Sequence, residues 1–142
     1  MPFNLALLDS EKAQEIKESF PEIKEWYLIG HSMGGLAAQK CAYRHSDEYA
    51  GLIVLGSRIK VDFSDNDLPI LLITASNDGI CTSELLEKEK TPMPKNYRHI
   101  VIEGGCHSYF ASYDKQFLDG TATISRHEQH MQIIDAIMEW LY

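Results

Sequence analysis

Four short apolar runs, well separated along the chain, constrain the fold more than any other feature of this sequence. They occupy residues 26–29, 51–56, 69–74 and 99–103. Apolar residues follow one another in these runs instead of alternating with polar ones. We therefore expect strands that are buried on both faces, as in a parallel sheet covered by helices. Helix-compatible segments separate the runs, so the sequence predicts an α/β fold: a three-layer α/β/α arrangement with a mostly parallel sheet of about four strands.

Capping and breaking signals place the helices between and after these runs. Ser10 predicts the start of a helix that reaches about residue 19, and Pro21 ends it. Further helices are expected at about residues 33–44 and, beginning at Thr82 or Ser83, up to about residue 90. Ser125 and Glu128 have the spacing of a capping box, which predicts the start of the last helix. Helical spacing groups four residues of that helix on one face, and two aromatic residues near its end are expected to pack it onto the sheet. The four are Met131, Ile134, Met138 and Leu141, and the two are Trp140 and Tyr142.

Size and charge limit the classes of function. A chain of 142 residues favours a single domain that spans residues 1–142. The formal net charge of −8 argues against nucleic acid or an anionic membrane as the main partner. The three cysteines, Cys41, Cys81 and Cys106, are odd in number and widely spaced, so they suggest neither a disulfide framework nor a zinc site. We expect reduced thiols in a cytoplasmic protein, without a signal peptide or a membrane span.

The segment Gly30-His31-Ser32-Met33-Gly34 fits the pattern G-x-S-x-G between a predicted strand and a predicted helix. A strand–turn–helix of this kind holds the serine in a strained conformation and exposes its hydroxyl above the sheet. We expect both flanking glycines to be needed, because side chains there would collide with the neighbouring strand and helix. An ordinary tight turn, such as a phosphate-binding loop, is the alternative interpretation of Ser32.

A serine nucleophile needs a base, and the base needs an acid that orients it. Reactive groups in parallel sheets gather where the strands end, so the residues after each predicted strand are the candidates. Asp78 follows the third run and His107 follows the fourth. The order serine, aspartate, histidine predicts a triad of Ser32, Asp78 and His107, which needs neither cofactor nor metal. Because Asn77-Asp78-Gly79 also has the composition of a simple turn, Asp114 and Asp119 remain alternative acids.

Other histidines and cysteines have simpler interpretations. His31 is expected to pack beside the serine. His127 and His130 lie three apart on the last helix, a spacing that could bind metal, but no third ligand is evident, so a surface position is expected. Cys106 precedes His107, yet adjacent side chains rarely face each other, so we do not expect a cysteine nucleophile.

These motifs resemble the α/β-hydrolase superfamily, and within it the dienelactone-hydrolase-like and esterase-like members. The resemblance rests on residues 30–35, 74–79, 104–107 and 119–125, and it covers nearly the whole chain. Where one subgroup of these proteins has asparagine before the histidine, this chain has Cys106. The resemblance implies a serine hydrolase of small esters or lactones, with the backbone N–H of Met33 as one oxyanion donor.

The resemblance also implies that the chain holds the last part of the family fold. Family members place four strands before the nucleophile strand, and here residues 2–8 look like the loop after the fourth of them. The loop that donates the second oxyanion N–H would then be missing, unless Asn4, the tail backbone or a second subunit replaces it. The nucleophile strand would lie at an edge of the sheet, and edge strands pair with other chains. We therefore expect a homodimer through this edge, or a complex with a missing N-terminal half. The alternative function is that of a catalytically impaired remnant, or a fragment of a longer hydrolase, that binds a partner.

Overall fold

The computed structural model describes residues 11–142. The expected N-cap Ser10, Asn4 and the tail at residues 2–8 lie outside this part. The elements in chain order are α1 (Lys12–Glu18), β1 (Tyr27–His31), α2 (Met33–Arg44), β2 (Gly51–Leu55), β3 (Ile70–Ala75), α3 (Ser83–Lys88), β4 (Tyr97–Ile102), the short 3-10 helix η3 (His107–Phe110) and α4 (Arg126–Leu141). All four strands fall on the apolar runs, and α2 has the predicted bounds.

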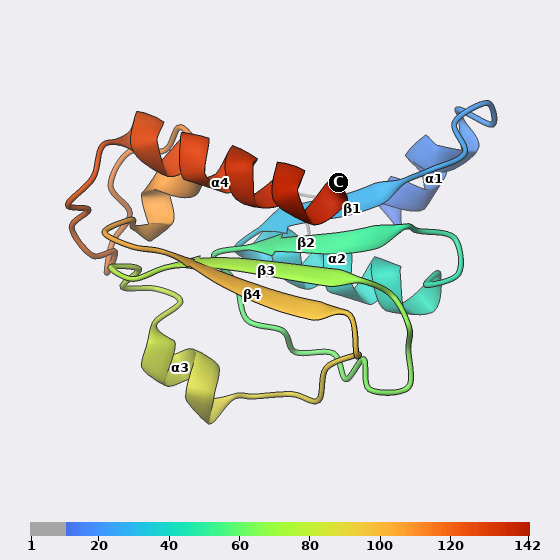
Figure 1. The fold of residues 1–142 in the computed structure, drawn as a ribbon, viewed down its shortest axis with the longest axis horizontal. Coiled ribbons are helices and arrows are strands. Elements are labelled where there is room, and N and C mark those ends of the chain that lie inside the picture. Colours follow the sequence, from blue (N-terminus) through green and yellow to red (C-terminus); the bar gives the residue numbers. More distant parts are fainter. Residues whose placement is uncertain (1–10) are drawn as a thin grey trace.

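The four strands form one parallel sheet in the order β1-β2-β3-β4. Helix α4 covers one face, and α2 and α3 lie on the other (Figure 1). Successive residues of β2 therefore enter different cores. Leu52 and Val54 pack with Ala38 and Cys41 of α2, whereas Ile53 and Leu55 join a second core with Ile133 and Ala136 of α4. This confirms the predicted three-layer α/β fold. Because all strands run the same way, the loops after them meet at one end of the sheet.

Burial separates the inner strands from the outer ones. Every residue of β2 and of β3 is buried. The prediction that the run at 99–103 is buried on both faces is wrong, since His99 and Val101 of β4 are exposed. Within the described residues, strand β4 pairs only with β3, and the helices cover it incompletely. Within residues 11–142, β1 also has a neighbour on one side only, and its Ile29 is 55% exposed.

Helix α4 begins as predicted but turns an unexpected face to the sheet. Ser125 caps it, with its side chain accepting from the Glu128 N–H at 3.1 Å and its own N–H donating to the Glu128 carboxylate at 2.7 Å. The sheet-facing residues are Gln129, Ile133, Ala136 and, half-buried, Ile137 and Trp140. The predicted apolar face therefore lies outward: Met131, Ile134 and Met138 are exposed, and Leu141 is only partly buried.

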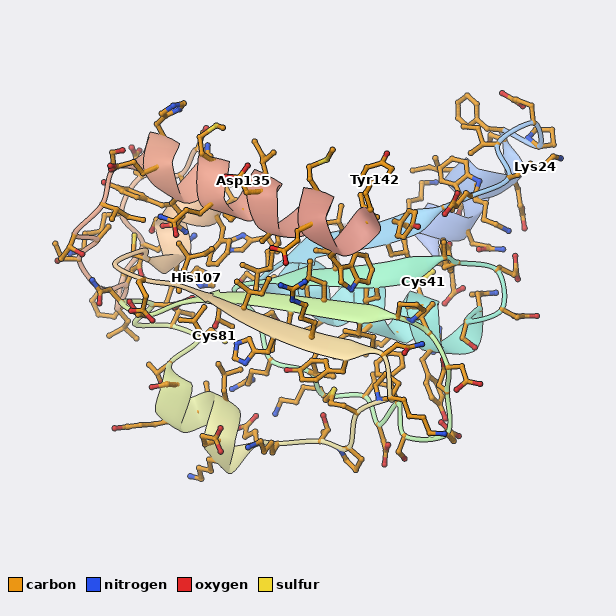
Figure 2. The ribbon with its side chains drawn as sticks, in the orientation of Figure 1. Lys24, Cys41, Cys81, His107, Asp135 and Tyr142 are labelled. Atoms are coloured by element: carbon orange, nitrogen blue, oxygen red, sulfur yellow. The ribbon has the colours of Figure 1, made fainter. Side chains whose placement is uncertain are left out.

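The two aromatic residues near the C-terminus behave differently. Trp140 packs edge-on against Tyr27 of β1, with ring centroids 5.9 Å apart, as expected. The expectation for Tyr142 is wrong, because its side chain is 96% exposed and projects from the end of α4 (Figure 2). It follows the last helical residue, so no further turn of helix presses it onto the sheet.

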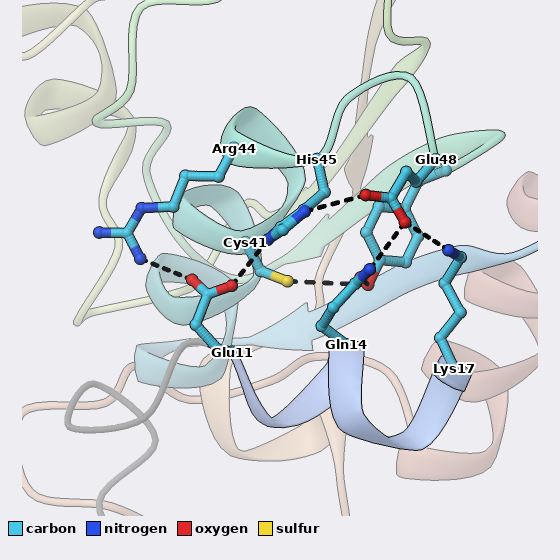
Figure 3. A network of polar contacts seen from close by, with 8 residues as sticks. Glu11, Gln14, Lys17, Cys41, Arg44, His45 and Glu48 are labelled. Carbon is cyan, nitrogen blue, oxygen red and sulfur yellow. Dashed lines mark hydrogen bonds and ion pairs between the residues drawn. The ribbon is translucent and has the colours of Figure 1, made fainter. Parts of the chain in front are cut away.

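A polar network fastens α1 to the end of α2 (Figure 3). His45 bridges two carboxylates, with Nε2 2.8 Å from Glu11 and Nδ1 3.1 Å from Glu48. Hydrogen bonds from Lys17, Gln14 and His45 lower the pKa of Glu48 to about 2. No residue of α1 is fully buried, and only its Ala13 packs against the core, so this network supplies much of the attachment of the helix.

The glycines of the β1–α2 turn differ in what surrounds them. A Cβ on Gly30 would lie 2.4 Å from the carbonyl oxygen of Gly34, and one on Gly35 would lie 3.0 Å from that of Gly30. A Cβ on Gly34 would meet no atom within 4 Å. The expectation that both flanking glycines are sterically required holds for Gly30 and is wrong for Gly34. Close contact of α2 with β1 depends on Gly30 and Gly35.

We predict that Gly30→Ala destabilises the protein in urea unfolding and that Gly34→Ala does not. The Gly30 variant must move backbone atoms and loses about 1–3 kcal/mol of unfolding free energy. The Gly34 variant has room for its methyl group and gains helix propensity, so its stability is unchanged or rises by up to about 1 kcal/mol. Equal losses in the two variants would contradict the packing of this turn.

Candidate active site

Ser32 lies at the turn between β1 and α2 in a backbone conformation that few residues adopt. Its φ is 53° and its ψ is −120°. In the described part of the chain, Leu118 is the other non-glycine residue with positive φ. Such a conformation costs on the order of 1–3 kcal/mol and needs support from its surroundings. The Ser32 N–H supplies part of that support by donating to the Leu55 carbonyl at 3.0 Å. The predicted strained turn is confirmed.

His107 and Asp78 form a buried pair at the same end of the sheet. His107 Nδ1 lies 2.8 Å from Asp78 Oδ2, and the two side chains are 1% and 0% exposed. The other carboxylate oxygen of Asp78 accepts from the N–H groups of Ile80, at 2.8 Å, and Cys81, at 2.6 Å. An ionised carboxylate only accepts, so the pair places the imidazole proton on Nδ1 and leaves Nε2 as an acceptor.

Asp119, one of the alternative acids, holds the backbone that carries His107. Its carboxylate accepts from the His107 N–H at 3.0 Å, and from the N–H and hydroxyl of Ser108 at 2.8 and 2.6 Å. Burial works to raise the Asp119 pKa, but the hydrogen bonds from Ser108 and His107 together bring it below its ordinary value. The other alternative, Asp114, is exposed. Of the three candidate acids, the structure pairs Asp78 with the imidazole.

Gln129 of α4 supports the same loop and was not anticipated from the sequence. Its fully buried amide accepts from the Cys106 N–H at 3.0 Å and donates to the Cys106 carbonyl at 2.9 Å. Helical spacing was the signal that could have indicated this role. Gln129 lies four residues before Ile133 and seven before Ala136, so the three share the buried face of the helix. Burial raises the pKa of the Cys106 thiol, which agrees with the expectation that this cysteine is no nucleophile.

Ser32 and His107 line one cavity of about 190 Å³ at the ends of the strands. Figure 2 shows His107 and Cys81 at this end of the sheet. The remaining lining residues are Met33, Leu36, Gly56, Ser57, Arg58, Ile80, Cys81 and Leu85. Within residues 11–142 the buried Nε2 of His107 has no hydrogen-bond partner, so Ser32 and His107 share the cavity without a hydrogen bond. Catalytic hydrogen bonds in unliganded enzymes often tighten only when substrate binds.

His31 packs beside His107, as expected. Its ring lies 4.6 Å from that of His107 and stacks on Phe110 and Tyr113, at centroid distances of 5.4 and 5.7 Å. Burial, with a smaller contribution from His107, lowers the pKa of His31 to about 4. His31 is therefore neutral near pH 7 and adds no positive charge beside the His107 imidazole.

No group of three or more His, Cys, Asp or Glu side chains in residues 11–142 could hold a metal ion. His127 is exposed and His130 partly so. No helix in the described part is both long and apolar enough to cross a bilayer.

Solved structures with a similar fold include three hydrolases. A thermophilic esterase from Thermogutta terrifontis has a TM-score of 0.67 at 16% identity, over 93% of this chain and 70% of that one. A serine hydrolase without lid from Xanthomonas campestris has a TM-score of 0.66 at 14% identity, over 96% and 59%. An α/β-hydrolase from a lagoon-sediment metagenome has a TM-score of 0.64 at 13% identity, over 96% and 71%. The chain thus spans between 59% and 71% of these three structures.

The sequence itself matches a family model. No curated protein matches the chain. The model of the alpha/beta hydrolase family matches residues 1–131, which is most of the 142 residues. With the parallel sheet and the strained serine turn, this match identifies the chain as a member of the α/β-hydrolase family.

Proposed function

We propose that this chain is a serine hydrolase of small carboxylic esters or lactones. In this proposal Ser32 is the nucleophile, His107 the general base and acid, and Asp78 the acid that orients His107. The observation that carries it is the buried hydrogen bond between His107 Nδ1 and Asp78 Oδ2, at a cavity that Ser32 also lines. The esterase among the structures of similar fold supports an ester substrate.

The reaction would proceed through an acyl-enzyme. The Ser32 hydroxyl attacks the substrate carbonyl while His107 Nε2 takes its proton. The oxyanion accepts from the Met33 N–H, which is free of helical bonding because Met33 begins α2. The tetrahedral adduct then collapses, the C–O bond to the alcohol breaks, and the alcohol leaves with the proton from His107. A water molecule, deprotonated by His107, attacks the acyl group and releases the acid and Ser32. These steps require no cofactor.

Cavity size and thiol state extend the proposal. A volume of about 190 Å³ favours a short acyl or lactone group over a lipid chain.

Cys41, Cys81 and Cys106 are free and buried. Free thiols persist in reducing compartments, which supports a cytoplasmic location.

We also propose that the outer edge of β1 pairs with a second copy of the chain. Within residues 11–142, β1 bonds only to β2, so its other edge presents unpaired N–H and C=O groups beside the exposed Ile29. Two identical edges can pair about a twofold axis, each satisfying the other. The outward apolar residues of α4, Met131, Ile134 and Met138, add surface that favours burial.

Light scattering after size exclusion at low concentration tests the dimer. We predict twice the mass of the chain for the wild type and a monomer for Ile29→Lys, because lysine on an edge strand opposes pairing. Val101→Lys, on the exposed face of β4 at the other edge, is the matched control and stays dimeric. A monomeric wild type would contradict this pairing.

A fluorophosphonate probe tests the nucleophile. We predict that the probe labels the wild type and that Ser32→Ala abolishes labelling, since only a hydroxyl activated by a neighbouring base reacts. Ser57→Ala removes the other hydroxyl that lines the cavity and remains labelled. Labelling of the Ser32 variant would place the nucleophile elsewhere. A folded wild type that resists the probe would favour a catalytically impaired hydrolase.

Asparagine substitutions distinguish the roles of the two buried aspartates. Asp78→Asn keeps an oxygen for the N–H groups of Ile80 and Cys81 but turns an amide donor toward His107 Nδ1. The imidazole proton then moves to Nε2, and we predict a loss of about 10⁴-fold in kcat with folding retained. Asp119→Asn instead lowers the urea concentration at the unfolding midpoint. The carboxylate oxygens of Asp119 accept hydrogen bonds from the backbone N–H groups of His107 and Ser108, and an amide replaces one of these acceptors with a donor. An Asp78 variant with nearly full kcat would contradict the assignment.

A further inference from the structure

Arg58 is the one side chain with a permanent positive charge at the cavity that Ser32 and His107 line. No other arginine or lysine of residues 11–142 lines this cavity, and no aspartate or glutamate does. The protein as a whole has a formal net charge of −8, which disfavours anions in general. The positive charge of Arg58 therefore favours anionic ligands at this cavity, whereas the negative charge of the protein as a whole repels them.

The backbone at Arg58 is fixed by a buried glutamine. Gln39 of α2 is fully buried, and its amide donates to the Arg58 carbonyl at 2.8 Å and accepts from the Lys60 N–H at 2.8 Å. Just before it, the Gly56 N–H donates to the Ile73 carbonyl at 2.8 Å. The segment that carries Arg58 is thus attached to both α2 and β3, which reduces the entropy lost when the side chain binds a ligand.

The charge of Arg58 is only partly neutralised within the protein. Its Nε lies 3.3 Å from Glu89 Oε2, and the same carboxylate also pairs with Lys60. Two cations therefore share one carboxylate, and the cluster is net positive. Within residues 11–142 the terminal nitrogens of Arg58 have no hydrogen-bond partner, and 30% of its side chain is exposed. These two nitrogens form the planar fork that binds a carboxylate through two parallel hydrogen bonds.

The charge of Arg58 acts on Cys81, another residue that lines the cavity. Burial raises the pKa of the Cys81 thiol to about 12, Asp78 adds to the rise, and Arg58 opposes it. Cys81 also donates its backbone N–H to Asp78, the partner of His107. The positive charge of the Arg58 guanidinium therefore acts on Cys81, whose backbone supports the proposed catalytic pair.

We propose that Arg58 selects substrates whose acyl group ends in a carboxylate, so that short half-esters of dicarboxylic acids are preferred over neutral esters of equal length. This inference rests on the proposed function. The cavity of about 190 Å³ limits the acyl group to a short chain. In the bound state the ester carbonyl lies at Ser32 and the distal carboxylate at the terminal nitrogens of Arg58.

Two p-nitrophenyl esters of matched length test the preference. The valerate ester is neutral, and the glutarate monoester replaces its terminal methyl with a carboxylate. For the wild type, we expect kcat/KM for the glutarate to exceed that for the valerate. Arg58→Gln should lower this ratio about 10-fold or more, as expected for loss of a charge-assisted hydrogen bond. Arg58→Lys keeps the charge without the fork and should give an intermediate ratio.

Lys60→Gln is the matched control, because it removes a positive charge from the same Glu89 cluster at a residue that does not line the cavity. Its ratio should fall by less than that of Arg58→Gln, because Glu89 then neutralises more of the Arg58 charge but the guanidinium stays at the cavity. Equal ratios for the two esters in the wild type, or equal effects of the Arg58 and Lys60 variants, overturn the inference. If Arg58→Gln does not fold, an unchanged ratio in Arg58→Lys overturns it. A wild type that hydrolyses neither ester and resists the fluorophosphonate overturns the proposed function, and this inference with it.

Discussion

The geometry of this site depends on the buried hydrogen bond between His107 and Asp78. It joins the loops that follow β4 and β3, and both side chains are almost completely hidden from water. A buried ion-pairing group is costly unless its remaining polar atoms are satisfied. Asp78 meets this requirement through the backbone N–H groups of Ile80 and Cys81, and the His107 loop is held by Asp119 and Gln129. The polar contacts around the pair therefore serve chiefly to hold the imidazole in one orientation.

The strain at Ser32 is the second constraint, and the sheet supports it. The serine adopts positive φ directly after β1, and its N–H is anchored to the last residue of β2. Gly30 and Gly35 allow α2 to lie close to β1, so the strained residue is held between a strand and a helix. The same arrangement begins α2 at Met33, which leaves a free backbone N–H next to the serine. Strain, close packing and a potential oxyanion donor thus arise from one turn.

Local signals in the sequence predicted much of this fold, and long-range contacts account for the rest. The bounds of α2 and the capping box of α4 follow from residues close together in the chain. The face of α4 that packs on the sheet does not follow from such local signals. This helix has one apolar stripe through Ile133, Ile137 and Trp140 and another through Met131, Ile134 and Met138. The stripe that meets the sheet shares its face with Gln129, whose amide bonds to Cys106.

The sequence favoured Asp78 as the partner of His107 but left Asp114 and Asp119 open, and the structure pairs Asp78 with the imidazole. Arg58 was passed over because an arginine after a strand has no local signature of binding. Its position at the cavity depends on Gln39, which lies 19 residues earlier in the chain.

We infer that Asp78 keeps the neutral His107 ring protonated on Nδ1, with Nε2 open to Ser32. Nitrogen-15 NMR of the histidine side chains reads the tautomer directly, with His107→Gln to assign the signal. We expect a protonated, strongly hydrogen-bonded Nδ1 and an unprotonated Nε2 in the wild type, and the reverse in Asp78→Asn. A wild-type ring protonated on Nε2, or one unaffected by Asp78→Asn, would contradict it.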